Sequence, residues 1–372
     1  MDIRKKIFIW LSMSELELGT LYDMLAYFPR IEELWELEKY QGKIVYALTG
    51  DEFRSFMAIK ESGELERVIN DLETGNIGFV CYFEQNYPEK FRELDYPPFV
   101  VYYRGDISLL NGNNIAIVGS RACTRYGKEQ TDRFSKELSK AGFNIVSGLA
   151  EGIDGCAHTG ALKANGKTIS VVANGLKSIF PAINVDLARE IVATGGVLIS
   201  EFYPDYKPKG FSFVQRNRLI AAASEAVLVV EAGKVSGALH TVNFALDLGR
   251  EVFAIPGNCN SSASEGTNNL IKKFYSMCVT SPQEIISQLN CTQNLKLQVS
   301  QSQNPIKRTD KISNLNETES LIYNMLQTED AHFDEILEKT QIEAKKLLVL
   351  LTTMEIRGLI RKLPANYFGK KD

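Results

Sequence analysis

Two short β-branched runs, each followed by a small-residue loop and a polar or mixed helical stretch, constrain the fold most strongly. The first run is Ile115–Val118, which leads into the Gly-Ser-Arg loop at 119–121. The second is Asn144–Val146, which leads into the loop at 147–154. Short apolar runs of this kind, bounded by small residues, are typical of strands buried in a parallel sheet. Residues 114–157 therefore predict a βαβα unit.

The loops of this unit predict a site for a phosphate-bearing ligand. Ligands of open parallel sheets bind outside the carboxyl ends of the strands, where both loops fall. Glycines allow close backbone approach, and N–H groups at helix starts favour anions. Arg121 adds a bidentate cation, although it could instead pair with a neighbouring carboxylate. The G-x-G-x-x-G fingerprint of dinucleotide enzymes is absent.

Strand and helix patterns continue to alternate up to residue 290. We expect strands at 168–172, 195–201, 226–231 and 251–255, and helices at 185–193 and 237–248. An entry element at 76–111 carries two strand-like runs, at 77–82 and 99–103, which could add a strand to the sheet. This alternation predicts an α/β domain over residues 76–290, with an extended Rossmann-like, doubly wound parallel sheet. The strand order cannot be read from the pattern.

The flanking segments differ in character. Residues 1–75 show helical apolar stripes and predict a small helical domain, in which the Gly-x-Gly hairpin of a DNA-binding helix-hairpin-helix is not visible. Residues 291–313 are polar and predict a linker. Residues 314–372 predict a winged helix of three helices and a two-strand wing. Its basic side could contact DNA, but interspersed glutamates fit a solvated face or a protein-docking module equally well.

Composition narrows the class of protein. Apolar residues make up 44% of the chain and charged residues 24%, and no run approaches the roughly 20 apolar residues that cross a bilayer. We therefore expect a cytoplasmic protein with no signal peptide and no membrane association. The six cysteines show no C-x-x-C spacing, which argues against a zinc site or a disulfide framework. The protein has a net charge of −4, so a polyanionic partner would have to bind to a local basic patch on its surface.

The stretch from 203 to 218 carries the clearest chemistry. It interleaves four aromatic residues with four cations, a pairing that suits single-stranded nucleic acid: cations neutralise phosphates and aromatic faces stack on bases. A purely structural role is the alternative, and Arg218 is the member that fits it best. Ser236 and Gly237 would cap the helix at 237–248 and offer hydrogen-bond donors to a phosphate. The alternative is that they only mark the start of this helix.

The sequence offers no convincing catalytic group. Each of His158 and His240 is expected on the apolar side of a helix, where a core histidine is the simpler reading. No G-x-S-x-G elbow accompanies a serine, no Walker A loop is present, and no metal-ligand spacing is recognisable. We therefore expect no enzyme activity, no metal and no cofactor. The residues weighed for a hydrolase are Ser147, Ser200, Ser236, His158, His240, Asp154 and Glu231.

Several blocks occur in one order, at 119–121, 147–158, 195–201, 216–218, 229–237, 249–257 and 266–268. Together they resemble the DNA-processing protein A family, from about residue 76 to 290. That family often carries a helical SAM-like domain before this region and a winged helix after it. The resemblance implies a non-enzymatic protein that binds incoming single-stranded DNA during natural transformation. It also implies a homodimer, formed near residues 255–271, that loads the RecA recombinase while displacing single-strand-binding protein.

The same resemblance implies roles for particular residues. Arg121 and Lys209 would hold phosphates, the Gly148 and Gly237 loops would add backbone donors, and one or both of two phenylalanines would stack on a base. The family commonly has Phe-Pro before Arg-Asn-Arg, whereas here Val and Gln follow the phenylalanine, so the stacking aromatic stays open. His240 stands where an aliphatic residue is expected. The remaining implied pocket residues are Phe211, Phe213, Ser120, Ser147, Arg216 and Asn217.

Two other classes of function remain as alternatives. Related Rossmann-like nucleotide phosphoribohydrolases use a P-G-G-x-G-T-x-x-E motif. Here Gly195-Gly196 is followed by Val-Leu-Ile, which disfavours that reading. A protein-interaction scaffold would fit the winged helix best.

Overall fold

A nine-stranded sheet forms the centre of the first of two compact units, Met1–Gln288 and Leu289–Asp372. The computed structural model describes residues 1–26, 28, 30–40, 48–290, 317–326, 331–342, 346–347, 350–351, 354, 359–362 and 367–370. The predicted linker at 291–313 therefore lies outside the described residues.

The order of the strands is β1-β2-β6-β5-β4-β3-β7-β8-β9. All neighbours from β6 to β9 pair in parallel, whereas β1 and β2 form an antiparallel extension at one edge. The predicted extended Rossmann-like sheet is confirmed, and the entry element supplies two strands to it. The strands are β1 (Gly78–Cys81), β2 (Val100–Gly105), β3 (Asn114–Val118), β4 (Asn144–Ser147), β5 (Thr168–Val171), β6 (Val197–Ser200), β7 (Ala226–Val229), β8 (Glu251–Ala254) and β9 (Met277–Cys278).

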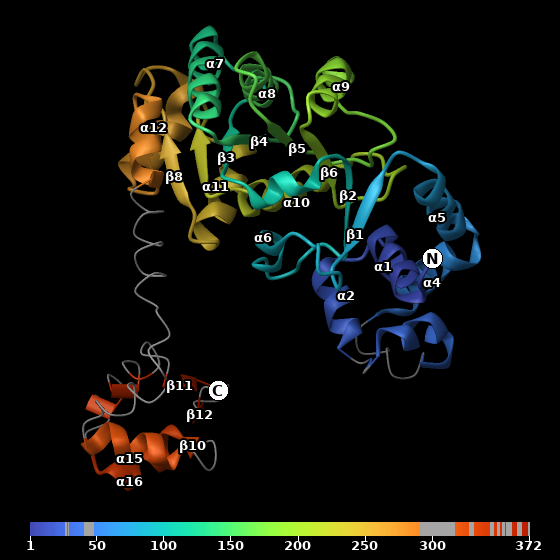
Figure 1. Cartoon of the computed structure of the whole chain (residues 1–372), viewed down its shortest axis with the longest axis vertical. Coiled ribbons are helices and arrows are strands. Elements are labelled where there is room, and N and C mark those ends of the chain that lie inside the picture. Colours follow the sequence, from blue (N-terminus) through green and yellow to red (C-terminus); the bar gives the residue numbers. More distant parts are fainter. Residues whose placement is uncertain are drawn as a thin grey trace. The chain divides into compact units, whose positions relative to one another are not determined.

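Helices cover both faces of this sheet. Figure 1 shows α7, α8 and α9 along one face and α10 and α11 along the other. Because both faces are covered, β3 to β7 are buried, with β4 half-exposed only at its first residue, which explains their β-branched composition. The helices are α7 (Arg125–Lys140), α8 (Ile153–Lys163), α9 (Val185–Ala193), α10 (Gly210–Ala222), α11 (Ala238–Asp247) and α12 (Glu265–Lys272), with shorter turns α6 (Glu89–Arg92), η2 (Ile107–Asn111), η3 (Ala182–Asn184) and η4 (Ser262–Ser264).

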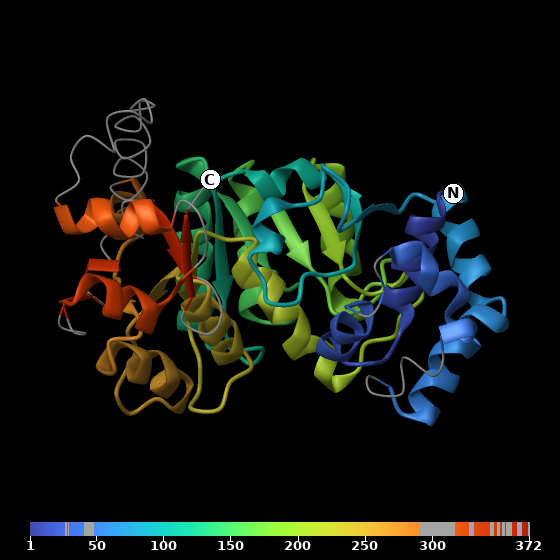
Figure 2. The same cartoon turned by 90° about the horizontal axis from the view of Figure 1, so that it is seen from below.

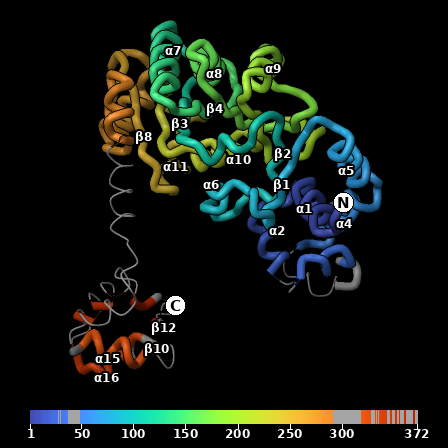
Figure 3. Tube along the Cα trace, viewed as in Figure 1, coloured from blue at the N-terminus to red at the C-terminus, as the bar shows by residue number. Residues whose placement is uncertain are grey.

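The path of the chain reverses beside β3. From β3 it adds β4, β5 and β6 on one side, and then α10 carries it back across the sheet to β7 on the other side of β3, as the tube in Figure 3 traces. Loops that follow β3 and β7 therefore leave the sheet in opposite directions. Such a switch point opens a crevice at the carboxyl ends of the strands.

The N-terminal helices lie at the β1–β2 edge of the sheet (Figures 1 and 2). Trp10 stacks on Phe56 with ring centroids 4.2 Å apart, and its indole donates to the Phe56 carbonyl at 3.0 Å. The Ser12 hydroxyl meets the Tyr102 hydroxyl of β2 at 2.7 Å. The helices therefore share one hydrophobic core with this edge of the sheet. They are α1 (Ile3–Met13), α2 (Leu18–Leu25), η1 (Ile31–Tyr40), α4 (Gly50–Glu61) and α5 (Glu64–Thr74).

The second unit contains a small three-stranded sheet in the order β10-β12-β11. The predicted wing, β11 (Ile360–Lys362) and β12 (Tyr367–Lys370), is present, and β10 (Ala331–His332) adds a strand that the pattern did not indicate. The first two predicted helices are α15 (Glu317–Met325) and α16 (Phe333–Thr340). Most of the third, at 343–354, lies outside the described residues. Within the described parts of the chain, no helix is long and apolar enough to cross a membrane.

The shared core predicts a large effect of one aromatic truncation. Phe56 is 1% exposed, so Phe56→Ala leaves a cavity beside Trp10 and should destabilise the protein by about 3–5 kcal/mol. Urea unfolding followed by circular dichroism measures this change. The same substitution at Phe274, which is 94% exposed, should leave the midpoint nearly unchanged. Equal shifts in the two variants would contradict the packing described here.

Candidate nucleic-acid interface

A buried carboxylate pins the loop after β3 at the switch point. Glu231, just beyond β7, accepts hydrogen bonds from the backbone N–H and the hydroxyl of Thr124, each at 2.7 Å. Its backbone carbonyl accepts from the N–H of Ser120 at 2.7 Å. This network holds the start of α7 against the end of β7. The sequence offers Glu231 as a candidate hydrolase residue, but in the structure its carboxylate accepts both hydrogen bonds from Thr124 and so holds the loop.

The loop after β4 closes against the same backbone. Gly152 has a φ of +78°, and a Cβ there would lie 2.3 Å from the Arg121 carbonyl oxygen, so only glycine fits without displacement. The N–H of Ile153 donates to the Ser120 carbonyl at 3.2 Å. These contacts fix the backbone from which the Arg121 side chain projects.

Arg121 is exposed and faces an aromatic ring. Its guanidinium carbon lies 4.8 Å from the centroid of Phe213, on α10, and the Phe213 ring lies 5.9 Å from that of Phe180. Among the described residues no carboxylate forms an ion pair with Arg121, so the alternative of a structural ion pair is not observed. Phe180 was missed from sequence because it lies in an irregular loop without periodicity.

A second cation lies beneath this surface. Arg216 is 4% exposed, and its Nη1 donates to the carbonyls of Gly148, at 2.6 Å, and Val171. Burial lowers the pKa of Arg216 to about 10, an effect that the Asp154 carboxylate opposes and Arg121 reinforces. Burial also raises the pKa of Asp154, and Arg216 counteracts that rise. Arg216 remains protonated at neutral pH, so two guanidinium groups act on the same crevice.

Several residues of the implied pocket support it from below. The Ser147 hydroxyl is fully buried and donates to the Ile117 carbonyl at 2.7 Å. Gly148 is also buried: a Cβ there would come within 2.6 Å of both Arg216 Nη2 and Asp154 Oδ2. Together with Arg216 itself, these residues do not present side chains to solvent. They are buried at the carboxyl edge of the sheet.

The loop after β7 leads into α11 on the other side of the switch point. Gly237 is the N-cap of α11, and the Ser236 hydroxyl accepts from the N–H of Ala238 at 3.4 Å, which confirms the predicted capping. The Asn217 amide donates to the Gly237 carbonyl at 3.1 Å and holds this loop to α10. Apart from its own neighbours along the chain, no described residue would come within 4 Å of a Cβ at Gly237, so the space on that side of its Cα is open.

Two predicted contact residues lie elsewhere on α10 or just before it. Phe211 is two positions from Phe213 and therefore points to the opposite side of the helix. It lines a groove with α11 to which neither Arg121 nor Phe213 contributes. The Lys209 ammonium pairs with the Glu15 carboxylate of the N-terminal segment. Arg218 forms a buried ion pair with Glu201, in agreement with its predicted structural role.

The two histidines that were weighed for catalysis differ. His158 is buried, and its Nδ1 lies 2.6 Å from the Thr168 hydroxyl, as expected for a core histidine. His240 is exposed, so the prediction that it faces the core was wrong: the buried side of α11 runs through positions 238, 241, 242 and 245. Among the described residues, no group of three histidine, cysteine, aspartate or glutamate side chains could hold a metal ion.

Comparison with known proteins identifies the family. Residues 78–290 match the model of DNA recombination-mediator protein A, and residues 307–366 match the DprA winged helix domain. The chain belongs to the DNA recombination-mediator protein A family. It is 40% identical to DNA processing protein DprA of Bacillus subtilis over 56% of this chain and 71% of that protein. It is 43% identical to protein Smf of Escherichia coli, an alignment that spans only 54% of either chain.

Two solved structures of the family are similar to this one. DNA processing protein A of Streptococcus pneumoniae superposes with a TM-score of 0.63 and 29% identity, over 77% of this chain and 98% of that one. The Helicobacter pylori protein, whose structure describes a single-stranded DNA binding mode, gives a TM-score of 0.53 and 33% identity. That match covers 58% of this chain and 96% of the other.

The buried histidine predicts a pH dependence of stability. Burial lowers the pKa of His158 from 6.5 to about 3, so the unfolded chain takes up this proton first as the pH falls. Stability should therefore drop below pH 6.5, by about 1.4 kcal/mol per pH unit until near pH 3. Urea unfolding at pH 7 and pH 5 measures the drop. His158→Gln should remove this component and His240→Gln should retain it; identical pH profiles in the two variants would refute the assignment.

Proposed function

We propose that this protein binds single-stranded DNA at the switch point between β3 and β7 and acts as a recombination mediator. The observation that carries the proposal is the exposed Arg121 guanidinium held 4.8 Å from the centroid of the Phe213 ring. In this proposal Arg121 would bind a phosphate and the neighbouring Phe213 would stack on a base. Cation and aromatic face in one groove are what sequence-tolerant binding of single strands requires.

The contacts follow from the geometry of the crevice. One phosphate would sit on Arg121, with N–H groups of the 236–237 loop as further donors and the Ser120 and Ser236 hydroxyls beside them. The neighbouring base would stack on Phe213, with Phe180 extending the aromatic surface. Arg216 and Asn217 act from below, since the first adds positive potential and the second holds the Gly237 loop.

Lys209 would provide a further phosphate contact after leaving Glu15. Both side chains of that ion pair are exposed, at 43% and 67%. Exposed pairs of this kind contribute only about 0–1 kcal/mol, which a phosphate can replace. Lys209 is therefore a secondary contact, and Arg121 is the principal one.

The wider role that we propose follows the family resemblance. The protein would protect incoming single-stranded DNA in the cytoplasm during natural transformation and load RecA while displacing single-strand-binding protein. A homodimer would form near residues 255–271. No catalytic step is proposed: Glu231 is held by Thr124, and the Ser147 and Ser200 hydroxyls donate to backbone carbonyls. For the winged helix, binding of DNA and docking of a protein both stay open.

Removal of the Arg121 cation tests the proposal directly. Arg121→Ala should weaken binding of a fluorescent oligo-dT by about 10- to 100-fold at low salt, because a charge-assisted contact of roughly 1.5–3 kcal/mol is lost. Fluorescence anisotropy across a salt series should also show a slope reduced by about 0.7. Arg189→Ala, a matched change on exposed α9, should bind like the wild type. Unchanged binding by Arg121→Ala would exclude this crevice as the site.

The two phenylalanines of α10 provide a matched pair for the stacking contact. Phe213→Ala should weaken oligo-dT binding by about 1–3 kcal/mol, since one base loses its aromatic face. Phe211→Ala should leave binding unchanged, because Phe211 lies on the other side of the helix. The same anisotropy titration compares both. A larger loss in Phe211→Ala would reverse the assignment of the stacking ring.

A further inference from the structure

An apolar groove with an acidic rim lies on the side of α10 that the proposed DNA site does not use. Phe211, Val214, Gln215 and Arg218 face it from α10, at the spacing of one helical face. Phe244 of α11 and Leu248, just after α11, form the facing wall, and the segments at 15–18 and 93–96 close the ends. The groove therefore lies between two helices and offers no free strand edge.

The groove exposes apolar surface that the fold itself does not cover. Phe211 is 52% exposed, Tyr96 47% and Val214 38%. Three large apolar side chains that are open to solvent in one groove differ from scattered exposed residues, which are ordinary. A cluster of this kind, rimmed by polar groups, is typical of an interaction site.

The rim is strongly negative. Five carboxylates line the groove against one guanidinium, that of Arg218, which is already paired with Glu201. Glu15 pairs with Lys209 and Glu93 with Arg250. The other three carboxylates have no ion-pair partner among the described residues. They are Glu17, Asp95 and Asp247.

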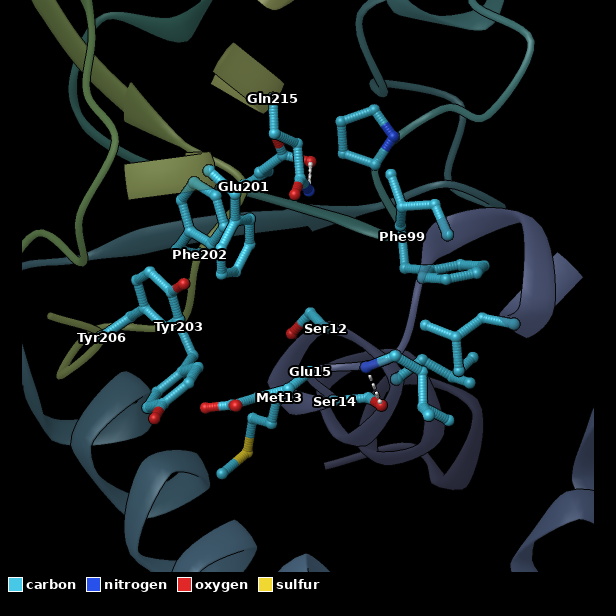
Figure 4. Close-up of a pocket in the computed structure, with 16 residues that line it drawn as sticks. Ser12, Met13, Ser14, Glu15, Phe99, Glu201, Phe202, Tyr203, Tyr206 and Gln215 are labelled. Atoms are coloured by element: carbon cyan, nitrogen blue, oxygen red, sulfur yellow. Dashed lines mark hydrogen bonds between the residues drawn. The ribbon is translucent and has the colours of Figure 1, made fainter. Parts of the chain in front are cut away.

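A smaller crevice adjoins the inner end of the groove and shares Glu15, Phe211 and Gln215 with it. Figure 4 shows Gln215 directed at Glu201, with Phe202 and Tyr206 beside them and Ser12 to Glu15 opposite. Glu201 Oε1 is buried and has no hydrogen-bond partner within the described part of the chain. Glu201 lines the smaller crevice and not the groove itself.

We propose that this groove docks a basic amphipathic helix of a partner protein. An apolar stripe would lie on Phe211, Val214 and Leu248, and flanking lysines or arginines would meet Glu17, Asp95 and Asp247. Helix-in-groove recognition requires this combination of apolar floor and complementary rim. Nucleic acid is repelled by the same carboxylates. The single helix α10 would then bind DNA on its Phe213 side and a protein partner on its Phe211 side.

The test uses the full-length protein and a fluorescein-labelled amphipathic helix of leucine and lysine. We expect saturable binding by anisotropy, at least tenfold tighter than that of a leucine–glutamate helix or of a scrambled leucine–lysine peptide. Saturating oligo-dT should not displace the helix. Equal binding of the three peptides, or displacement by oligo-dT, would overturn the proposal.

Variants locate the site and separate it from DNA binding. Phe211→Ala should weaken peptide binding about tenfold without affecting oligo-dT, and Phe213→Ala should do the reverse. Glu17→Gln, Asp95→Asn and Asp247→Asn combined should also weaken the peptide about tenfold. The control for net charge combines Glu61→Gln, Glu66→Gln and Glu190→Gln, all exposed and outside the groove, and should bind normally.

Two outcomes would refute the assignment even if the peptide binds. Equal weakening by the two triple variants would mean that only net charge matters. If sedimentation velocity shows a wild-type dimer that Phe211→Ala dissociates, the occupant is a second copy of this chain rather than a partner. Because the peptide assay does not require DNA, its failure is independent of failure of the proposed function.

Discussion

The rest of the structure depends on one constraint: after β6, the chain returns to the other side of β3 and adds its next strand, β7, there. Because β4 and β7 flank β3, the loops that follow β3 and β7 diverge and leave a crevice at the carboxyl edge of the sheet. The Glu231 carboxylate then joins these two loops through Thr124. These bonds hold the loop that carries Arg121 in place. The Arg121 side chain projects from this loop and has no carboxylate partner among the described residues.

Charge is distributed over two levels at this crevice. Arg216 is buried and satisfied by backbone carbonyls and by the nearby Asp154, so its charge costs less to bury than an isolated one would. Arg121 above it is solvent-exposed and oriented by the Phe213 ring. In the proposed function, the lower cation would add positive potential and the upper one would exchange water for phosphate.

Helix α10 contributes to both of the surfaces that we propose as binding sites. Residues two apart on a helix point to opposite sides, so Phe211 and Phe213 face different surfaces of α10. Phe213 lies beside Arg121, and Phe211 opens onto the acidic groove beside α11. Since the same helix carries both, a partner held in the groove would lie close to a DNA strand without sharing its contacts.

The sequence by itself determined the parallel sheet and the site loops. β-Branched runs at 115–118, 144–146 and 226–230 must be buried on both faces, and the small residues after them must turn at the same edge. Tertiary structure alone decided which side chains meet there. The partners of Arg121, the burial of Ser147 and Arg216, the exposure of His240 and the place of Phe180 depend on contacts between distant segments, which local periodicity does not encode. In the sequence, α10 is a mixture of aromatic and basic residues. Only its packing against the sheet and α11 shows that Phe211 and Phe213 lie on different faces of the helix.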